Sequence, residues 1–395
     1  MNAADYSVSA DLARDFSWAE RRALVVGAAG VLLCLIGAIF DPVQFLRSYL
    51  VAFIFVLGVA LGSMALLMVH HLSGGGWGLV IRRALEAATR TIPLLAVFFL
   101  PIVLGIPKLY SWALSDVVAH DAVLRHKSLY LNVPFFVGRA IFYFCGWYLL
   151  AHLLSKWSLA QDRDGDPRWG KRMHAFSGPG LIFYGLSVTF ASVDWIMSLD
   201  AHWFSTIFGI LLMGGQALSA MSFVIAVAVI LAARSPMKEA VSATLLHDLG
   251  KFLFAFIMLW AYFNFSQFLI IWAGNLTEEI PWYLIRMNGG WQWIGLALVV
   301  LHFGLPFGLL LSRDLKRRNG ALMRVAVMLL IMRLMDIFWM VAPNFHPQGL
   351  RVHWMDFAAP IGLAGLWLSF YLRQLKSRPL LPAGDPELAE VFAHE

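Results

Sequence analysis

Residues 185–209 read Gly-Leu-Ser-Val-Thr-Phe-Ala-Ser-Val-Asp-Trp-Ile-Met-Ser-Leu-Asp-Ala-His-Trp-Phe-Ser-Thr-Ile-Phe-Gly. Two long apolar runs meet here across a short polar connector at 199–203. Trp195 and Trp203 flank the connector, and such amphipathic rings favour a membrane–water boundary. Asp194 lies one residue inside Trp195, where a carboxylate is costly to hold in hydrocarbon. The stretch therefore predicts a joint between two helical bundles in a bilayer, with a polar site near its outer end.

The composition excludes an ordinary soluble domain. Of the 395 residues, 60% are hydrophobic and 14% are charged, whereas soluble domains average about 45–50% apolar and about 25% charged residues. Cys34 and Cys145 both lie inside apolar runs and are expected to be buried small hydrophobes. The chain has no cysteine cluster for an iron–sulfur or zinc site and no Cys-x-x-Cys-His motif for covalent haem.

The apolar runs predict an all-α polytopic membrane protein with about ten transmembrane helices, each long enough to cross a hydrocarbon core of about 30 Å. The predicted spans are Glu20–Phe40, Gln44–Leu72, Leu79–Ile106, Val133–Trp157, Phe176–Leu199, Phe204–Ala233, His247–Trp272, Gly289–Ser312, Gly320–Val341 and Trp354–Gln374.

The distribution of basic residues tests this set of spans. Of the 30 Lys and Arg residues, about 21 fall on the N-terminal side of the membrane and about 6 on the other side. The positive-inside rule then places both termini in the cytoplasm. Topology thus explains the net charge of +6, and no nucleic-acid partner is expected.

The domain organisation follows from the spans. A cytoplasmic tail at 1–18 precedes a transmembrane domain at 19–375, in which two four-helix bundles occupy about 44–199 and 204–342, with the remaining helices peripheral. The N-terminal tail is too long and too acidic to begin a secretory signal, so the first span is expected to be retained. The polar C-terminal tail at 376–395 is expected to have little order.

An outer set of charged residues lies inside the predicted spans. Intramembrane ionisable groups normally face a bundle interior and pair with one another. Arg333 and Asp336 are three residues apart, on one helix face, and Arg139 and Asp194 are expected at a similar depth. The four groups predict one proton-transfer or quinone-headgroup cluster, with Arg139, Asp194 and Asp336 as candidate quinone contacts. The competing interpretation of Arg333 and Asp336 is a self-neutralising structural pair.

An inner set of polar residues is expected nearer the cytoplasm. Glu86 and Arg90 are four residues apart on the third span and are predicted to pair. The remaining candidates for proton transfer are His247, Asp248, Lys251 and the mid-depth His302. Groups near helix ends can instead extend to the interface, and His302 can be a hydrogen-bonded structural histidine. Taken together, the two sets suggest two half-paths for protons.

No resident redox centre is expected in this chain. Haem b is not expected, because His70, His71 and His152 lie at span ends and His302 has no evident partner at its depth. No Ser-His-Asp arrangement or His-Glu-x-x-His motif is found, so neither a catalytic triad nor a metal site is predicted. Electron transfer would require a bound quinone or partner subunits.

Several long motifs resemble the F-type integral membrane subunit of bacterial alternative complex III, in the polysulfide reductase NrfD-like family. The resemblance covers nearly all the spans. The motifs that carry it are Asp194-Trp-Ile-Met-Ser-Leu-Asp200-Ala-His-Trp203, Ser205-Thr-Ile-Phe-Gly209, His247-Asp-Leu-Gly-Lys251, Trp260-Ala-Tyr-Phe-Asn-Phe-Ser-Gln-Phe268, Gly274-Asn-Leu-Thr-Glu-Glu-Ile-Pro-Trp-Tyr283, His302-Phe-Gly-Leu-Pro-Phe-Gly-Leu-Leu-Leu-Ser-Arg313 and Met335-Asp-Ile-Phe-Trp339.

The resemblance implies a multi-pass protein of the bacterial inner membrane, within a respiratory quinol:cytochrome c or quinol:oxidase oxidoreductase. It implies a sister ten-span membrane subunit, an iron–sulfur subunit, haem c subunits and a terminal oxidase as partners. The haem c and iron–sulfur clusters would belong to those partners, and quinone or quinol would be the ligand of the membrane part.

Two further functions remain open from the sequence. The chain could be a structural anchor for the sister and iron–sulfur subunits, in which case its buried charges matter only for assembly. It could also be a stand-alone secondary transporter, because two bundles and polar mid-membrane groups permit that architecture.

Overall fold

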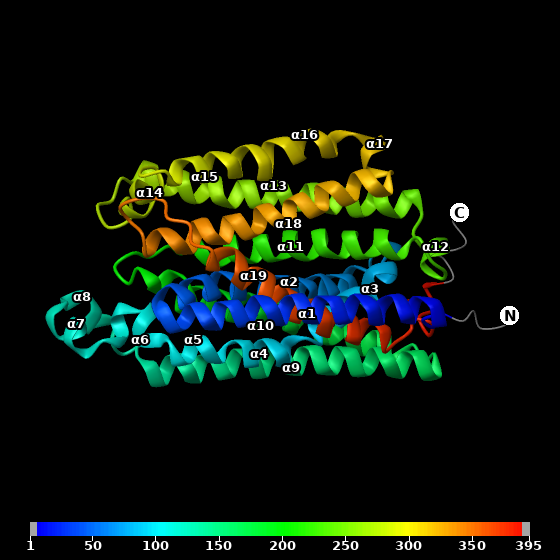
Figure 1. Cartoon of the computed structure of the whole chain (residues 1–395). Helices are drawn as coiled ribbons and strands as arrows, with labels where there is room; N and C mark the ends of the chain where they lie inside the picture. Colours follow the sequence, from blue (N-terminus) through cyan, green and yellow to red (C-terminus); the bar gives the residue numbers. More distant parts are fainter. Residues whose placement is uncertain (1–5, 389–395) are drawn as a thin grey trace.

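The computed structural model describes residues 6–388, and every regular element in this range is a helix (Figure 1). Within the range, ten helices or helix series are long and apolar enough to cross a membrane. The chain is therefore an all-α, multi-pass membrane protein, as predicted. Residues 1–5 and 389–395 of the two predicted tails lie outside the described part of the chain.

Each predicted span corresponds to one observed helix or helix series. The spans are α1 (Ala10–Phe40), α2 (Pro42–Ser73), α3 to α5 (Gly76–Thr89, Ile92–Phe98 and Leu100–Leu104), α9 (Val133–Asp164), α10 (Arg168–Trp195) with η2 (Met197–Leu199), α11 (Phe208–Leu231), α13 (Ala243–Gly274), the series α15, η3 and α16 (Trp291–Ala297, Leu298–Gly304 and Leu305–Leu311), α18 (Asn319–Val341) with η4 (Ala342–Asn344), and α19 (Met355–Lys376).

Short helices connect these spans. They are α6 (Ile106–Leu109), η1 (Ser111–Ala113), α7 (Ser115–His120), α8 (Ala122–Lys127), α12 (Met237–Ala240), α14 (Pro281–Arg286) and α17 (Arg313–Lys316). The elements η1, α7 and α8 lie in the connection between the third and fourth spans.

Two helix boundaries have clear local causes. Helix α1 begins at Ala10, within the predicted tail, because the hydroxyl of Ser9 accepts a hydrogen bond from the backbone N–H of Leu12 at 3.3 Å and caps the first turn. The third span is broken into three helices, and Pro93 and Pro101 each lie in the first turn of a new helix. Proline is tolerated there because the first-turn N–H groups have no intrahelical partner.

Helices α2 and α11 form the centre of the molecule. Helix α2 packs against α3 and α10, helix α11 packs against α13 and α18, and α2 and α11 pack against each other. At this joint, a Cβ atom on Gly62 would lie 2.0 Å from the backbone oxygen of Gln216, so only glycine lets the two backbones approach. The contact joins one group of helices, α2 to α5, α9 and α10, to a second group, α11, α13, α15–α16 and α18.

Helices α1 and α19 pack along each other outside this centre. Gly27 and Gly30 of α1 meet Gly362 and Gly365 of α19, and a Cβ on Gly30 would lie 2.8 Å from the Cα of Gly362. Small residues spaced in this way allow close helix approach in membranes, where van der Waals packing drives helix association.

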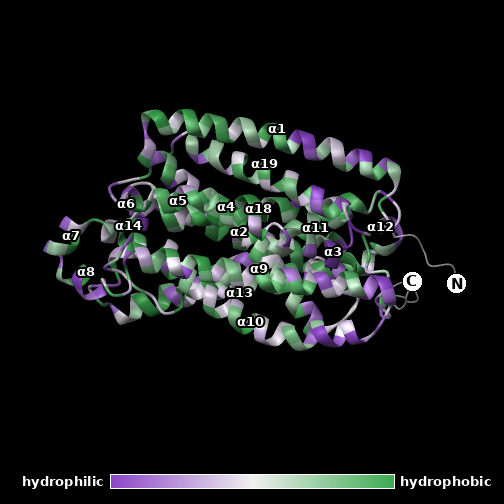
Figure 2. Cartoon of the chain, turned by 90° about the horizontal axis from the view of Figure 1, so that it is seen from below, coloured by the Kyte–Doolittle hydropathy of each residue, from purple (hydrophilic) through white to green (hydrophobic). Residues whose placement is uncertain are grey.

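Both described chain ends lie at the same end of the bundle, and α7, α8 and α14 lie at the opposite end (Figure 1). Hydrophilic residues gather toward the two ends, whereas the middle of the helices is mainly hydrophobic (Figure 2). This distribution is the one expected of a protein that spans a bilayer.

The expectation of little order in the C-terminal tail is wrong for residues 377–388. Leu380 and Leu381 are buried, and the backbone N–H of Leu380 donates to the carbonyl of Tyr6. Asp385 forms an ion pair with Arg82 at 2.8 Å. This segment is ordered because its apolar residues pack against the helix ends that are predicted to face the cytoplasm, and because one of its carboxylates forms an ion pair there.

Candidate functional site

The second group of helices contains a cavity of about 650 Å³. Its wall is mostly aromatic and aliphatic, with polar side chains at a few points: Asn264 of α13, Arg286 of α14, Gln292 of α15 and Asp336 of α18. Ligand cavities in proteins commonly have about this volume, a mainly apolar lining and a few converging polar groups. The cavity is therefore the candidate functional site.

Asp336 supplies the carboxylate of this cavity. Only 1% of the residue is exposed, and Arg333, one turn before it on α18, pairs with Oδ2 as the three-residue spacing predicts. The indole Nε1–H of Trp260 donates to the same oxygen at 2.8 Å. Within residues 6–388, Oδ1 has no hydrogen-bond partner, so one carboxylate oxygen remains free to accept a proton or a hydrogen bond.

His302 lies behind Trp260. The two rings stack with their centroids 4.2 Å apart, and His302 is fully buried with no hydrogen-bond partner for either ring nitrogen. The residue belongs to η3, a π-helical segment inside the eighth span. Such segments often occur at functional sites. The neighbours Leu298 and Phe303 line the cavity, so the π-helical segment forms part of its wall.

Arg286 is a cationic member of the cavity lining. Its guanidinium stacks on Trp282 at 3.6 Å and donates to the carbonyls of Trp282 at 2.9 Å and Met340 at 2.8 Å. Burial lowers the pKa of Arg286 to about 9, which still leaves it charged at neutral pH. The cavity therefore has a positive group from α14 and a negative group from α18.

Arg139 and Asp194 form a separate pair in the first group of helices. The Nε and Nη2 atoms of Arg139 donate to the two oxygens of Asp194 at 2.9 and 2.7 Å, and the hydroxyl of Tyr143 donates to Oδ2 at 2.9 Å. The guanidinium also lies 3.8 Å from the ring of Tyr130. This bidentate pair fixes α9 against α10.

The four outer charges thus form two pairs instead of the one cluster predicted. Arg139 and Asp194 lie on α9 and α10, whereas Arg333 and Asp336 lie on α18, and α11 packs against both α10 and α18. Neither Arg139 nor Asp194 lines the cavity beside Asp336. Sequence spacing could identify the groups but not the packing order that separates them.

The predicted pairing of Glu86 with Arg90 is wrong. Glu86 instead pairs with Arg82 at 3.1 Å and with Arg83 at 2.6 Å, and it accepts a hydrogen bond from Ser158 of α9. Arg90 is the C-cap of α3, and its backbone N–H still donates to the carbonyl of Glu86 at 3.1 Å, but its side chain turns away and donates to Gln374 of α19. The four-residue spacing is present, but Arg82 and Arg83 occupy Glu86, and Gln374 and Ser377 hold the Arg90 side chain.

The candidates at the start of α13 lie at the surface. Lys251 pairs with Asp248 at 2.9 Å, and their side chains are 59% and 43% exposed. His247 is partly exposed, and its Nδ1 has no hydrogen-bond partner among the described residues. These three residues therefore do not join the buried clusters.

Sequence reasoning missed four residues that complete the buried clusters. Arg82 and Arg83 lie near the start of the third predicted span and are buried around Glu86. Trp260 lies inside one of the quoted motifs. The only sequence feature that indicates its position is its spacing of four residues from Asn264, which places both side chains on one helix face. Arg286 lies in the connection between the seventh and eighth predicted spans, and nothing in its local sequence indicates that its side chain is buried.

The sequence matches no protein-family model, and no curated protein matches it. Within residues 6–388, no group of three or more His, Cys, Asp or Glu side chains could hold a metal ion. The proposed function is therefore based on the geometry of the site.

Proposed function

We propose that the chain is an integral membrane subunit of a quinol-oxidising respiratory complex, and that its cavity in the second group of helices binds the quinone or quinol ring beside Asp336. The observation that carries this proposal is a largely apolar cavity of about 650 Å³ with a buried carboxylate in its wall. A quinol is complementary to such a cavity, because its ring is apolar and its two hydroxyl groups can donate hydrogen bonds to a carboxylate. The long motifs described above support membership of an alternative complex III of the bacterial inner membrane.

The chemistry assigned to the chain is proton transfer. Oxidation of a quinol breaks two O–H bonds and releases two protons and two electrons. Asp336 Oδ1 would accept the protons one at a time, while Arg333 and Trp260 hold the carboxylate through Oδ2. The electrons would pass to an iron–sulfur or haem c centre of a partner subunit.

The other buried pairs have supporting roles in this proposal. Both oxygens of Asp194 are held by Arg139 and Tyr143, so this carboxylate is suited to joining helices. Quinone contact is therefore assigned to Asp336 among the predicted candidates. Glu86, with Arg82 and Arg83, remains a candidate for proton transfer near the predicted cytoplasmic end.

The test uses the native complex purified through an affinity tag on this chain. Its subunits are identified by mass spectrometry, and its quinol:cytochrome c turnover is measured for the wild type and for Asp336→Asn. The variant should keep the subunit composition and lose turnover by about 10²-fold or more, the usual contribution of a positioned proton-transfer group. Asp248→Asn, at an exposed pair, is the matched control and should retain turnover.

The alternative functions predict different results. A purely structural anchor predicts wild-type turnover for Asp336→Asn whenever the complex assembles. A stand-alone transporter predicts that the chain purifies without haem or iron–sulfur proteins. Either result would remove the proposed role of the cavity.

A further inference from the structure

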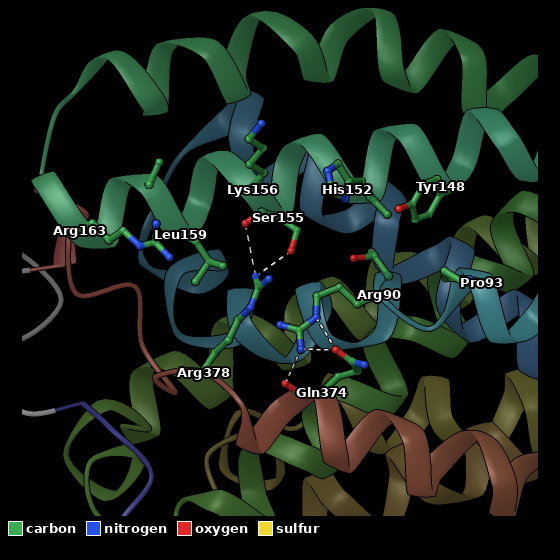
Figure 3. Close-up of a pocket in the computed structure, with 13 residues that line it drawn as sticks. Arg90, Pro93, Tyr148, His152, Ser155, Lys156, Leu159, Arg163, Gln374 and Arg378 are labelled. Carbon is green, nitrogen blue, oxygen red and sulfur yellow. Dashed lines mark hydrogen bonds between the residues drawn. The ribbon is translucent and has the colours of Figure 1, made fainter.

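A second cavity, of about 470 Å³, lies at the end of the bundle that carries the two termini. It is bounded by the α3–α4 junction, by the last turns of α9, and by the end of α19 with the segment that follows it (Figure 3). Arg90 enters the cavity from the α3–α4 junction and Arg378 from the segment after α19 (Figure 3). Lys156 and Arg163, both on α9, complete the basic part of the lining.

The lining has no counter-charge for these cations. Of the thirteen described residues that line the cavity, four are Lys or Arg and none is Asp or Glu. Outside the lining, Oε2 of Glu86 lies 3.7 Å from Nη1 of Arg378, but Glu86 also pairs with Arg82 and Arg83. The cavity therefore keeps an excess of positive charge that an anion would neutralise.

Neutral groups hold the two arginines in place. Arg90 donates from Nε to the side-chain oxygen of Gln374 at 2.8 Å and from Nη2 to Ser377 Oγ at 2.8 Å. Arg378 donates from Nη1 to Ser155 Oγ at 2.7 Å. Among the described residues, Nη1 of Arg90 and Nη2 of Arg378 have no hydrogen-bond partner. Two fixed guanidinium groups thus retain unused donors in one cavity.

Lys156 and Arg163 have no hydrogen-bond or ion partner within residues 6–388, and both are exposed at the wall of the cavity. Burial is also the main cause that lowers the pKa of Arg378, which lies outside the spans. Glu86 and Asp162 act in the opposite direction on Arg378, but Lys156 and Arg163 add further positive charge to the same cavity.

The surface around the cavity combines a charged part and an apolar part, as a lipid-binding site does. Its lining continues along α9 to Tyr148, and the same side of α9 and α4 exposes Leu149 and Val97, which are 53% and 57% exposed. Apolar side chains of transmembrane helices that face outward contact acyl chains. The charged part lies where the helices end, at the depth of lipid headgroups, and basic pockets of this kind bind anionic headgroups.

We infer that this cavity binds the phosphate group of an anionic phospholipid, whose acyl chains lie along α4 and α9. The unused N–H groups of Arg90 and Arg378 hold the phosphate oxygens, because guanidinium groups match phosphate geometry well. Lys156 and Arg163 add attraction at the rim. The bound lipid bridges α3, α9 and the segment after α19, and it should therefore stabilise the fold.

The test measures lipid binding to the purified full-length chain in neutral detergent by native mass spectrometry, together with thermal unfolding. Three probes are compared: dioleoyl phosphatidylglycerol, dioleoyl phosphatidylcholine and inorganic phosphate. The anionic lipid should remain bound and raise Tm more than the zwitterionic lipid with the same chains. Inorganic phosphate should bind much more weakly, because it gains nothing from the apolar surface. Equal effects of the two lipids, or phosphate binding as tight as the anionic lipid, would overturn the proposal.

Two double variants test whether the lipid binds in this cavity. Lys156→Gln with Arg163→Gln removes two rim charges that form no hydrogen bond or ion pair within residues 6–388, so folding should be preserved, and affinity for phosphatidylglycerol should fall about tenfold or more. Arg317→Gln with Arg318→Gln removes the same charge from exposed positions at the same end of the bundle, away from the cavity. The control should bind like the wild type. An equal loss in both variants would mean that lipid is attracted by overall charge and not by this cavity.

Discussion

The indole Nε1–H of Trp260 on α13 donates a hydrogen bond of 2.8 Å to Asp336 Oδ2 on α18, and both side chains line the same cavity. The bond joins two helices of the second group and leaves Asp336 Oδ1 without a partner among the described residues. Trp260 also stacks on His302 of the π-helical segment. One aromatic residue thus connects the carboxylate, the cavity wall and the buried histidine.

Trp260→Phe should weaken the site while retaining an aromatic ring. The substitution removes a hydrogen bond to a charged group, which contributes about 1.5–3 kcal/mol. Quinol turnover and thermal stability of the complex should both fall. The matched control is Trp339→Phe, because Trp339 lines the same cavity and its Nε1 has no hydrogen-bond partner in the described part of the chain. Equal effects of the two substitutions would show that ring size matters here and that the bond to Asp336 does not.

The Arg139–Asp194 pair should behave as a structural clamp. Arg139→Leu leaves the fully buried Asp194 without its bidentate partner and should cost about 3–5 kcal/mol of stability. The double variant Arg139→Leu/Asp194→Leu removes both charges and should recover part of that loss. The measurement is thermal unfolding of the purified chain for the two single variants and the double variant. Strictly additive losses would argue against a direct coupling of the two side chains.

The joint between α2 and α11 should not tolerate a side chain at Gly62. A Cβ there would lie 2.0 Å from the backbone oxygen of Gln216, so Gly62→Ala must push the helices apart, at a cost of about 1–3 kcal/mol. Gly308→Ala on α16 is the control, because its Cβ would meet nothing within 4 Å and alanine favours a helix by about 1 kcal/mol. A comparison of Tm should therefore show opposite signs for the two variants.

Acid should destabilise the loop that contains His346, which lies between α18 and α19. Burial, followed by the charges of Arg47 and Arg351, lowers the pKa of His346 below 6.5, and Asp356 acts in the opposite direction. The unfolded chain therefore binds more protons than the folded chain just below pH 6.5, so stability falls as pH falls through this window. The loss of Tm between pH 7 and pH 5 should be smaller in His346→Gln, and an unchanged pH profile would contradict this assignment.

The fold could be predicted from the sequence because hydrophobic length alone identifies membrane spans. All ten predicted spans correspond to helices, although α1 begins earlier than Glu20 because Ser9 caps it. The pairing of Arg333 with Asp336 could also be predicted, since it depends only on spacing within one intact helix.

The partners across helices could not be predicted in the same way. Arg139 meets Asp194 because α9 and α10 are neighbours, and Arg90 does not pair with Glu86 because Gln374 of α19 holds its side chain. Arg82 pairs with Asp385, which lies 303 residues later in the chain. These contacts depend on packing and on chain ends, which local sequence patterns do not specify.

The central claim is that a quinone ring occupies the cavity beside Asp336. The most direct measurement is photolabelling of the native complex with an azido-quinone, with the labelled peptides mapped by mass spectrometry and excess natural quinone used as the competitor. Competed label on cavity-lining peptides of α13, α15 and α18, reduced in Asp336→Asn, is the predicted result. Competed label confined to α9 and α10 or to a partner subunit, with these three helices unlabelled, would contradict it.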